Sequence, residues 1–536
     1  MRKGGLLCLL LMAASCANRV APTGGEKDTT PPKLLEAVPS ENSLHFSAKE
    51  IRLKFDEYVT LNDLQNQLMI SPLTPKQPVV KVGKRELIIE MPDSLQPNTT
   101  YTLSFGKAIV DVHESNPLAD FKYVFSTGDY LDSLSLSGEV KEAAVLAGSK
   151  GVTVLVYRKK NTSEDDSLPF KSRPSYFSRT NDKGMFRISN MAAGEYYVYA
   201  VEDKNNNYFC DRPWEEPFGF LGRSVKLPGD SILWLKTALE YPAQVRMTKT
   251  SRVDRRAIQA YFNQPDIPLQ LRDFAGNVLP PEQLWWSATH DTVTIFDLKG
   301  EDSLRLVALQ GEKIIDSLQV RLIPEPGVKA PELMNRYKIL SSPQDLGPSA
   351  PVMMQSQHPL QAGSGEIFLQ EDSSKMIALR FQVTEPGKGV FSISYPWKEG
   401  ANYKLMLPPG QINDIFEAKT DTARFSFRVP DEKSTSTLTL KIEGLSPSGR
   451  YILQLLTEKM EVLKETVLPS DTSVTFKYLQ ATGIRIRIIN DLNRDGHWTP
   501  GQYSLKRQPE PVYVHPDKLN LRANWELETV ISPEFE

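Results

Sequence analysis

The sequence predicts an all-β protein built from tandem β-sandwiches. Short runs such as residues 51–55, 101–105 and 121–125 alternate apolar and polar side chains. A period of two, carried by β-branched and aromatic residues, is typical of half-buried strands. Clusters of Pro, Gly, Asn and Asp separate these runs, and the chain contains 39 prolines. Helical periodicity is confined to one or two turns at residues 62–69, so many short strands with frequent turns favour sandwiches.

The N-terminus has the three parts of a secretory signal. Arg2 and Lys3 supply positive charge, and an uncharged apolar run follows over residues 6–14. This run is shorter than the roughly 20 apolar residues that a membrane-spanning helix needs, so we interpret it as an export signal. The signal ends in three small residues that are followed by Cys16.

This segment resembles the lipobox of bacterial lipoproteins, which implies cleavage before Cys16 and lipidation of its sulfur. The acyl chains would hold the protein on a membrane, because each buried methylene adds about 0.8 kcal/mol. Ala17 in place of Asp resembles the pattern sorted to the outer membrane. No acid-rich stretch directly follows Cys16, where Arg19 is the first charged residue, and this favours the periplasmic face over the cell surface. The alternative is an ordinary signal peptide with a cysteine at this place by chance.

The composition limits the classes of partner. The 63 basic and 66 acidic residues nearly cancel, so no bulk charge is available to attract nucleic acid. Cys210 is the only cysteine that remains after Cys8 and Cys16 are assigned to the signal and the lipidation site, which leaves no internal disulfide. We interpret Cys210 as a buried or half-buried thiol without a chemical role.

Two segments about 300 residues apart share one pattern, which predicts an internal repeat. The shared positions are Tyr101, Asp111 and Phe125 in one segment, and Tyr403, Asp414 and Phe427 in the other. The pattern predicts a strand, an ordered loop and a second strand in each copy. The two aspartates are candidates for catalytic carboxylates. However, a residue that repeats in tandem domains more often fixes a loop, so we favour a capping role.

A second repeated pattern follows each of these segments. Residues 194–207 and 483–496 both contain a glycine, a predicted strand and an Asp-x-Asn-x-Asn/Asp loop in the same order. The chain is therefore predicted to use a two-domain unit twice, with additional β structure between the copies at about 240–345.

The first unit resembles two known modules. Residues 31–128 resemble the bacterial Ig-like domain of the SbsA type, through the opening Thr-Thr-Pro-Pro at 29–32, the strand at 51–55 and the closing Phe-Ser-Thr-Gly at 125–128. This arrangement, together with the lipobox, resembles the Ig-like-domain lipoproteins of the Bacteroidota.

Residues 134–238 resemble the carboxypeptidase regulatory-like, or transthyretin-like, sandwich. The resemblance rests on Ser-Gly-Glu-Val at 137–140, Thr-Asn-Asp-Lys-Gly at 180–184 and Gly-Glu-Tyr-Tyr at 194–197. Gly184 ends a predicted hairpin turn, where a positive φ is accessible to glycine at little cost.

These observations give a complete predicted division of the chain. It comprises a lipoprotein signal peptide at 1–15, a flexible tether rich in Gly, Thr, Pro and Lys at 16–30, the Ig-like domain at 31–128, the carboxypeptidase regulatory-like sandwich at 134–238, a β-rich domain of unclear type at 240–345, a degenerate Ig-like domain at 346–429 and a second transthyretin-like sandwich at 430–536.

The two Asp-x-Asn-x-Asn/Asp loops are the strongest local signal of a ligand site. Alternate side-chain oxygens of a tight loop can converge on Ca²⁺, which takes about six to eight oxygen ligands. The candidate ligands are Asp203, Asn205, Asn207 and Asp211 in the first loop, and Asp491, Asn493 and Asp495 in the second. Position 12, where an EF-hand needs a bidentate Glu, holds Trp214 and Gln502. We therefore favour Asx-turns that cap their own backbone over calcium sites, and no other cofactor is predicted.

Three tryptophans are candidates for a binding surface. Trp285, Trp286 and Trp498 could stack on sugar rings or on a partner's side chains, although packing in a core or hinge is the favoured interpretation. Catalytic motifs are missing from the sequence. The six histidines are dispersed without metal-ligand spacing, and neither a Gly-x-Ser-x-Gly elbow nor a Gly-rich phosphate loop occurs.

The sequence thus predicts a membrane-anchored, non-catalytic binding or scaffold module whose partner is an unknown envelope protein or glycan. Two alternatives stay open. One is a glycan-binding lipoprotein of an outer-membrane uptake system, with the tryptophans as its platform. The other is an enzyme with its site in the region 240–345.

Overall fold

The computed structural model is almost all β, with 46% of residues in strands and 5% in helices, which confirms the predicted fold class. It describes residues 27–160, 165–254, 256–265, 269–273, 276–287, 289–296, 303–321, 333–341, 346–372 and 374–535. The helix α2 (Leu64–Gln67) lies inside the segment predicted to make one or two helical turns. No helix within the described ranges has the length and apolarity to cross a membrane. Cys16 and the predicted signal peptide lie outside the described residues.

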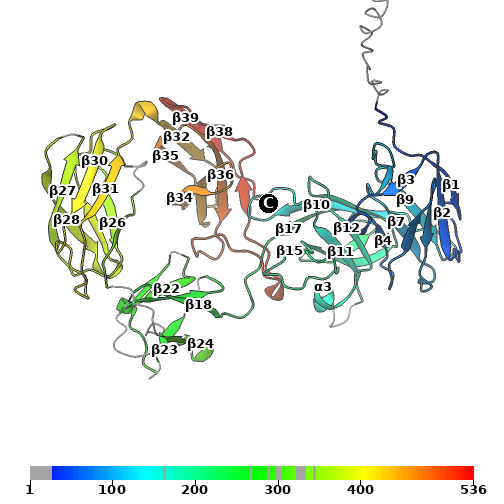
Figure 1. Ribbon diagram of the computed structural model, residues 1–536, viewed down its shortest axis with the longest axis horizontal. Coiled ribbons are helices and arrows are strands. Elements are labelled where there is room, and N and C mark those ends of the chain that lie inside the picture. The colour runs from blue at the N-terminus through cyan, green and yellow to red at the C-terminus, as the bar shows by residue number, and fades with distance from the viewer. Residues whose placement is uncertain are drawn as a thin grey trace, which may run out of the picture.

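The first sandwich (34–126) lies at one end of the molecule, in blue in Figure 1. Its strands are β1 (Leu34–Val38), β2 (Glu50–Phe55), β3 (Val59–Leu61), β4 (Met69–Ser71), β5 (Val79–Val82), β6 (Glu86–Glu90), β7 (Thr100–Ser104), β8 (Ile109–Asp111) and β9 (Lys122–Ser126). The sheet β1-β2-β6-β5 and the sheet β4-β7-β9 enclose one core, and β3 pairs with β8. The predicted alternation holds in β2, where Ile51, Leu53 and Phe55 are buried between exposed neighbours.

The second sandwich (134–237) follows with β10 (Leu134–Glu142), β11 (Thr153–Arg158), η1 (Asp165–Ser167), α3 (Leu168–Lys171), β12 (Tyr176–Arg179), β13 (Met185–Met191), β14 (Gly194–Val201), β15 (Phe218–Phe220), β16 (Val225–Leu227) and β17 (Ile232–Thr237). The sheets β13-β10-β17 and β12-β11-β14-β15 enclose its core. Gly184 has a φ of +79°, as its predicted turn requires, and a Cβ there would meet the carbonyl oxygen of Val140 at 2.4 Å.

The fifth sandwich (436–531) repeats the strand order of the second. Its elements are β32 (Ser436–Ile442), β33 (Tyr451–Leu456), β34 (Val462–Leu468), β35 (Thr472–Leu479), β36 (Gly483–Asn490), η6 (Tyr503–Leu505), β37 (Val512–Val514), β38 (Leu519–Asn520) and β39 (Trp525–Ile531). Its sheets are β35-β32-β39 and β34-β33-β36-β37. In both sandwiches the last strand pairs in parallel with the first, β17 with β10 and β39 with β32.

The third sandwich (247–321) comprises β18 (Met247–Arg252), β19 (Ile258–Phe262), β20 (Gln270–Arg272), η2 (Pro281–Gln283), β21 (Leu284–Trp286), β22 (Thr292–Ile295), β23 (Ser303–Gln310) and β24 (Lys313–Arg321). The sheets β18-β19-β22-β21 and β20-β23-β24 contribute to one core. Its described core is smaller than those of the other sandwiches.

The fourth sandwich (337–428) comprises β25 (Tyr337–Ile339), β26 (Val352–Ser356), β27 (Ser364–Glu371), β28 (Ile377–Glu385), η4 (Pro386–Lys388), β29 (Val390–Ile393), β30 (Asn402–Leu407) and β31 (Ala423–Arg428). A single sheet, in the order β25-β26-β29-β28-β27-β30-β31, contains all seven strands. Side chains from every one of them contact one core, so the sheet curls around it.

The spacing of 24 residues in the repeat is explained by strand register. Tyr101 pairs with Phe125 across β7 and β9, and Tyr403 pairs with Phe427 across β30 and β31. The paired rings stack at centroid distances of 5.4 and 5.7 Å. Each tyrosine hydroxyl also accepts a hydrogen bond from the backbone N–H five residues upstream. The repeated tyrosine and phenylalanine therefore fix the same strand pair in both sandwiches.

The repeated aspartates act as caps, as predicted. Asp111 is 1% exposed and accepts hydrogen bonds from four successive backbone N–H groups, those of residues 113–116. Asp414 accepts from the N–H groups of Phe416 and Ala418. Both carboxylates thus satisfy the backbone of the loop that connects the paired strands.

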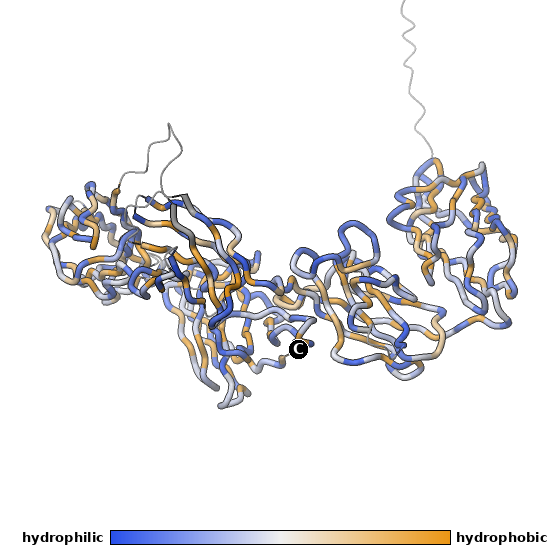
Figure 2. The backbone as a smooth tube through the Cα atoms, turned by 90° about the horizontal axis from the view of Figure 1, so that it is seen from below, coloured by the Kyte–Doolittle hydropathy of each residue, from blue (hydrophilic) through white to orange (hydrophobic). Residues whose placement is uncertain are grey.

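The chain doubles back, so that sandwiches far apart in sequence are in contact. The fifth sandwich lies beside the second, while the third and fourth lie at the other end from the first (Figure 1). Hydrophobic and hydrophilic segments alternate along the backbone of each sandwich, as Figure 2 shows. The contacts between second and fifth sandwiches include a hydrogen bond of 3.0 Å between the hydroxyls of Tyr199 and Tyr503, and Cys210 is buried in the same cluster.

Candidate functional site

The first Asp-x-Asn-x-Asn loop follows β14 and is held by its own hydrogen bonds. Asp203 accepts from the N–H groups of Asn207 at 3.1 Å and Tyr208 at 2.8 Å. The side-chain amides of Asn205 and Asn207 donate to Asp211 at 2.7 and 2.9 Å. The four predicted residues are therefore brought together, in the pattern of an Asx-turn.

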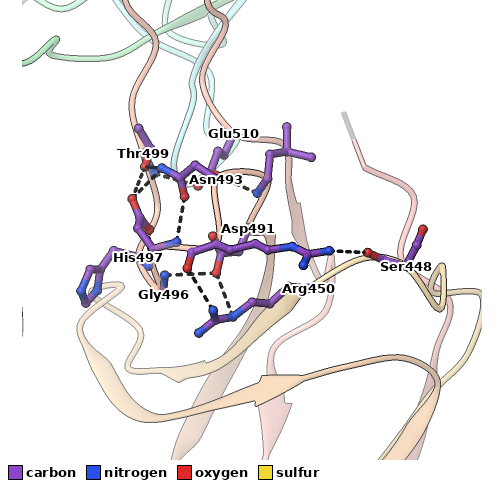
Figure 3. A network of polar contacts seen from close by, with 11 residues as sticks. Ser448, Arg450, Asp491, Asn493, Gly496, His497, Thr499 and Glu510 are labelled. Carbon is purple, nitrogen blue, oxygen red and sulfur yellow. Dashed lines mark hydrogen bonds and ion pairs between the residues drawn. The ribbon is translucent and has the colours of Figure 1, made fainter. Parts of the chain in front are cut away.

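The second loop follows β36 and has the same plan (Figure 3). Asp491 is 2% exposed and accepts the N–H of Gly496 at 3.1 Å. The side-chain amide of Asn493 donates to Asp495 at 2.6 Å. Arg450 lies beside this loop, with its Nε 3.2 Å from the Asp491 carboxylate, and supplies a positive charge next to that carboxylate.

A buried glutamate supports each loop, and sequence reasoning missed both. Glu216 accepts hydrogen bonds from the N–H groups of Lys204 and Asp211, and Glu510 accepts from those of Leu492 and Thr499. Burial raises the pKa of Glu510, and the charge of Asp495 acts in the same direction against the backbone hydrogen bonds that lower it. The two glutamates follow their first aspartates by 13 and 19 residues, so no common spacing could have revealed them.

The calcium hypothesis stays a prediction for both loops. Within the described part of the chain, no three His, Cys, Asp or Glu side chains are grouped so that they could hold a metal ion. One observation favours a cation in the second loop: Asp491 Oδ1 is buried without a hydrogen-bond partner among the described residues. The Asx-turn interpretation accounts for most of the polar atoms, and the Arg450 guanidinium accounts for the charge.

We expect calcium to leave the thermal stability of the full chain unchanged. The reason is that backbone N–H groups, the Asn amides and Arg450 already contact every loop carboxylate, although Asp491 Oδ1 itself has no partner among the described residues. Melting temperatures measured in excess EGTA and in millimolar calcium should agree, and the variant Asp495→Asn should behave like the wild type in this comparison. An increase of several degrees with calcium, absent in Asp495→Asn, would establish a cation site, because a ligand that binds only the folded state stabilises it.

The three candidate tryptophans belong to three different clusters. Trp285 packs against Phe296 at 4.6 Å on the side of the fourth sandwich, whereas Trp286 packs against Phe262 in the core of the third. They are successive residues of β21 and so point to opposite faces. Trp498 lies in a cluster of the fifth sandwich and donates its indole N–H to the carbonyl of Glu510. The three rings do not form one stacking platform.

A cleft of about 950 Å³ lies between the third and fourth sandwiches. One wall is the outward face of the sheet β18-β19-β22-β21, where Gln259, Thr294 and Trp285 are cross-strand neighbours. The other wall is formed by β25 and β26, where Lys338 pairs with Gln355. The indole N–H of Trp285 donates to the carbonyl of Gly387 across the junction, so this ring joins the two walls.

A buried His–Asp cluster fixes the same junction, and sequence reasoning did not find it. The two ring nitrogens of His358 each lie 2.6 Å from a carboxylate oxygen, Nε2 from Asp254 of the third sandwich and Nδ1 from Asp414 of the fourth. His358 is fully buried and the two aspartates are 3% and 1% exposed. No substrate can reach the imidazole, so the arrangement serves as a link between sandwiches.

Comparison with known proteins supports the fold of the first sandwich. The family described as a bacterial Ig-like domain matches residues 28–127, which confirms the Ig-like domain expected there. No match to a curated protein sequence was found.

Solved structures of a pilin subunit, a surface-layer protein and an α2-macroglobulin show weak likenesses. The major pilin subunit BcpA of Bacillus cereus is 9% identical, with 76% of this chain and 100% of the pilin covered and a TM-score of 0.15. Domains 1–6 of the surface-layer protein SbsC are 9% identical over 92% and 67% of the two chains, with a TM-score of 0.14. E. coli α2-macroglobulin is 11% identical over 90% and 42%, with a TM-score of 0.15. Values this low carry no argument about function.

Proposed function

We propose that this protein is a lipid-anchored, non-catalytic scaffold or binding module of the bacterial envelope. The observation that carries the proposal is the way in which the sandwiches are joined. Buried side chains link the second to the fifth and the third to the fourth, which favours a body that presents its surfaces in fixed orientations. The Ig-like domain and the all-β architecture are suited to this role, since rigid sandwiches support exposed loops.

The finer parts of the proposal concern the anchor and the domain types. We infer that Cys16 carries the lipid, that the anchor lies in the outer membrane with the protein on its periplasmic face, and that the partner is an envelope protein or a glycan. The second and fifth sandwiches are proposed to be carboxypeptidase regulatory-like. Their shared strand order, with the last strand parallel to the first, supports a common origin for these two units.

The variant Cys16→Ala tests the anchor. In a Gram-negative host fed with an alkyne-bearing fatty acid, the wild type should incorporate label and sediment with the outer membrane. Cys16→Ala should carry no label and should appear in the soluble periplasmic fraction, because no other residue is predicted to be acylated. Cys210→Ala is the matched control and should behave like the wild type, since its thiol is buried. Label that persists in Cys16→Ala, or an unlabelled wild type, would refute the anchor.

A further inference from the structure

The cleft between the third and fourth sandwiches has a marked excess of positive charge. Arg336, Lys338 and Lys388 line it, and none of its described lining residues is acidic. Lys388 forms an ion pair with Glu385 at 2.9 Å. Arg336 and Lys338 are exposed and have no ion-pair partner within the described ranges. The cleft therefore presents two uncompensated cations to whatever enters it.

The two cations are held at a defined position. Lys338 lies in β25 and Arg336 precedes it by two residues, so both side chains leave the same face of the strand. The neighbours Tyr337 and Ile339 pack against the core of the fourth sandwich, although Tyr337 also borders the cleft. Because the strand is fixed by this core, the backbone positions from which the two cationic side chains extend are fixed with it.

The remaining lining is suited to a ring that bears hydroxyl groups. Thr294 and Gln259 lie side by side on one wall, where the Gln259 amide donates to the Thr294 hydroxyl at 3.3 Å and accepts from the Tyr261 hydroxyl at 2.9 Å. On the other wall the Gln355 amide donates to the carbonyl of Lys388 at 3.1 Å, which orients its own oxygen. Oriented amides and hydroxyls beside an indole are the groups that recognise a sugar, whose polar edge and apolar face they match.

Trp285 gives the cleft an apolar end that the fold holds in place. A Cβ at Gly389 would lie 2.9 Å from its ring, and Gly389 has a φ of +67°, so glycine is required at this contact. The edge of Phe296 supports the same indole. The volume of about 950 Å³ lies near the upper end of small-ligand sites and leaves room for more than one ring.

We propose that this cleft binds an acidic saccharide, with the carboxylates of uronic acid residues at Arg336 and Lys338 and the sugar rings between Trp285 and the amides. A guanidinium binds a carboxylate through two parallel hydrogen bonds, and a neutral saccharide would leave both cations unpaired. This inference rests on the proposed binding function and deepens it by naming the class of glycan, and it does not depend on lipidation of Cys16.

The test uses the full chain carrying Cys16→Ala, so that binding and anchoring are measured separately. The probes are oligogalacturonate, alginate and chondroitin oligomers, and the matched neutral probe is methyl-esterified oligogalacturonate. We expect calorimetry to show binding of at least one acidic oligomer. The affinity for its neutral form should be lower by about tenfold or more, as loss of a charge-assisted hydrogen bond implies. Affinity should fall as salt increases.

Substitutions locate the site. Arg336→Gln and Lys338→Gln should each weaken binding of the acidic oligomer about tenfold while leaving the melting temperature unchanged, because both side chains are exposed. Lys404→Gln removes an exposed positive charge from β30 of the same sheet, outside the cleft, and should leave the affinity unchanged. The proposal is overturned if no acidic oligomer binds, if the neutral ester binds equally well, or if the two cleft variants bind as tightly as Lys404→Gln.

Discussion

The substitution His358→Ala is expected to lower the free energy of unfolding by about 3–5 kcal/mol, because it removes the positive charge that lies between two buried carboxylates. His358 is fully buried and lies 2.6 Å from both Asp254 and Asp414. Denaturant titration followed by tryptophan fluorescence measures the loss, and hydrogen exchange should show faster exchange around β26 and β29. His113→Ala, which removes an exposed imidazole, should change stability by less than about 0.5 kcal/mol.

A triple variant separates charge burial from lost packing. Asp254→Asn, Asp414→Asn and His358→Ala together remove all three charges, so this protein should be more stable than His358→Ala alone. If the single variant loses less than about 1 kcal/mol, or if the triple variant is the less stable of the two, the cluster does not hold the junction in the way inferred here.

The same cluster sets a pH window for the junction. Burial by itself disfavours the imidazolium, but hydrogen bonds and charges from Asp254 and Asp414 outweigh it and raise the pKa of His358 from 6.5 to about 9. Its contribution to stability is therefore complete below pH 6.5 and is lost as the pH rises toward 9. For Asp414, burial raises the pKa, while the bonds from His358 and the backbone lower it to below 3.8, so its contribution is lost only on strong acidification.

The pH dependence can be measured as the difference in unfolding free energy between the wild type and His358→Ala. The gap in unfolding free energy between wild type and His358→Ala should be widest at about pH 4–6.5 and should narrow between pH 7 and 9.5. A gap that grows with pH in this range would contradict the assignment of a positive charge to His358.

The second large effect is expected from Tyr503→Ala, which should uncouple the fifth sandwich from the second. The Tyr503 side chain is 7% exposed and enters an aromatic cluster of the second sandwich, with ring centroids 5.0 Å from Phe220 and 5.5 Å from Phe218. Its N–H also donates to the buried carboxylate of Glu240 at 2.8 Å. Truncation of a buried aromatic residue costs about 3–5 kcal/mol.

Scattering and unfolding together test this junction. In Tyr503→Ala, small-angle X-ray scattering should show a larger radius of gyration, and the unfolding transition should broaden or split as the sandwiches melt separately. Tyr503→Phe removes the hydroxyl, which hydrogen bonds to Tyr199 and contacts Lys506, and should cost about 1 kcal/mol with no change in shape. Tyr130→Ala, at a residue that is 63% exposed, is the control for loss of a tyrosine. An unchanged radius for Tyr503→Ala would show that other contacts hold the fifth sandwich.

Local pattern was enough to predict the strands and the repeated caps. The alternation at residues 51–55 corresponds to β2, and the spacing of Tyr101 to Phe125 and of Tyr403 to Phe427 corresponds to cross-strand pairs. Such features are visible in the sequence because backbone geometry fixes the period of a strand and the register of the strands that a loop connects. The capping role of Asp111 and Asp414 is also local, since each carboxylate accepts hydrogen bonds from backbone N–H groups a few residues further along the same loop.

The sequence by itself thus determined the all-β class, the repeated strand pairs, the Asx loops and the presence of an Ig-like domain at the start. The tertiary structure decided which residues meet across sandwiches: His358 with Asp254, 104 positions apart, Tyr503 with Tyr199, 304 positions apart, and the two walls of the cationic cleft. Contacts between separately folded units leave no period in the chain, because burial at a junction depends on how whole sandwiches are oriented. The orientation of the sandwiches therefore decides which residues contact a buried charge or ring, and no local spacing in the sequence predicts these contacts.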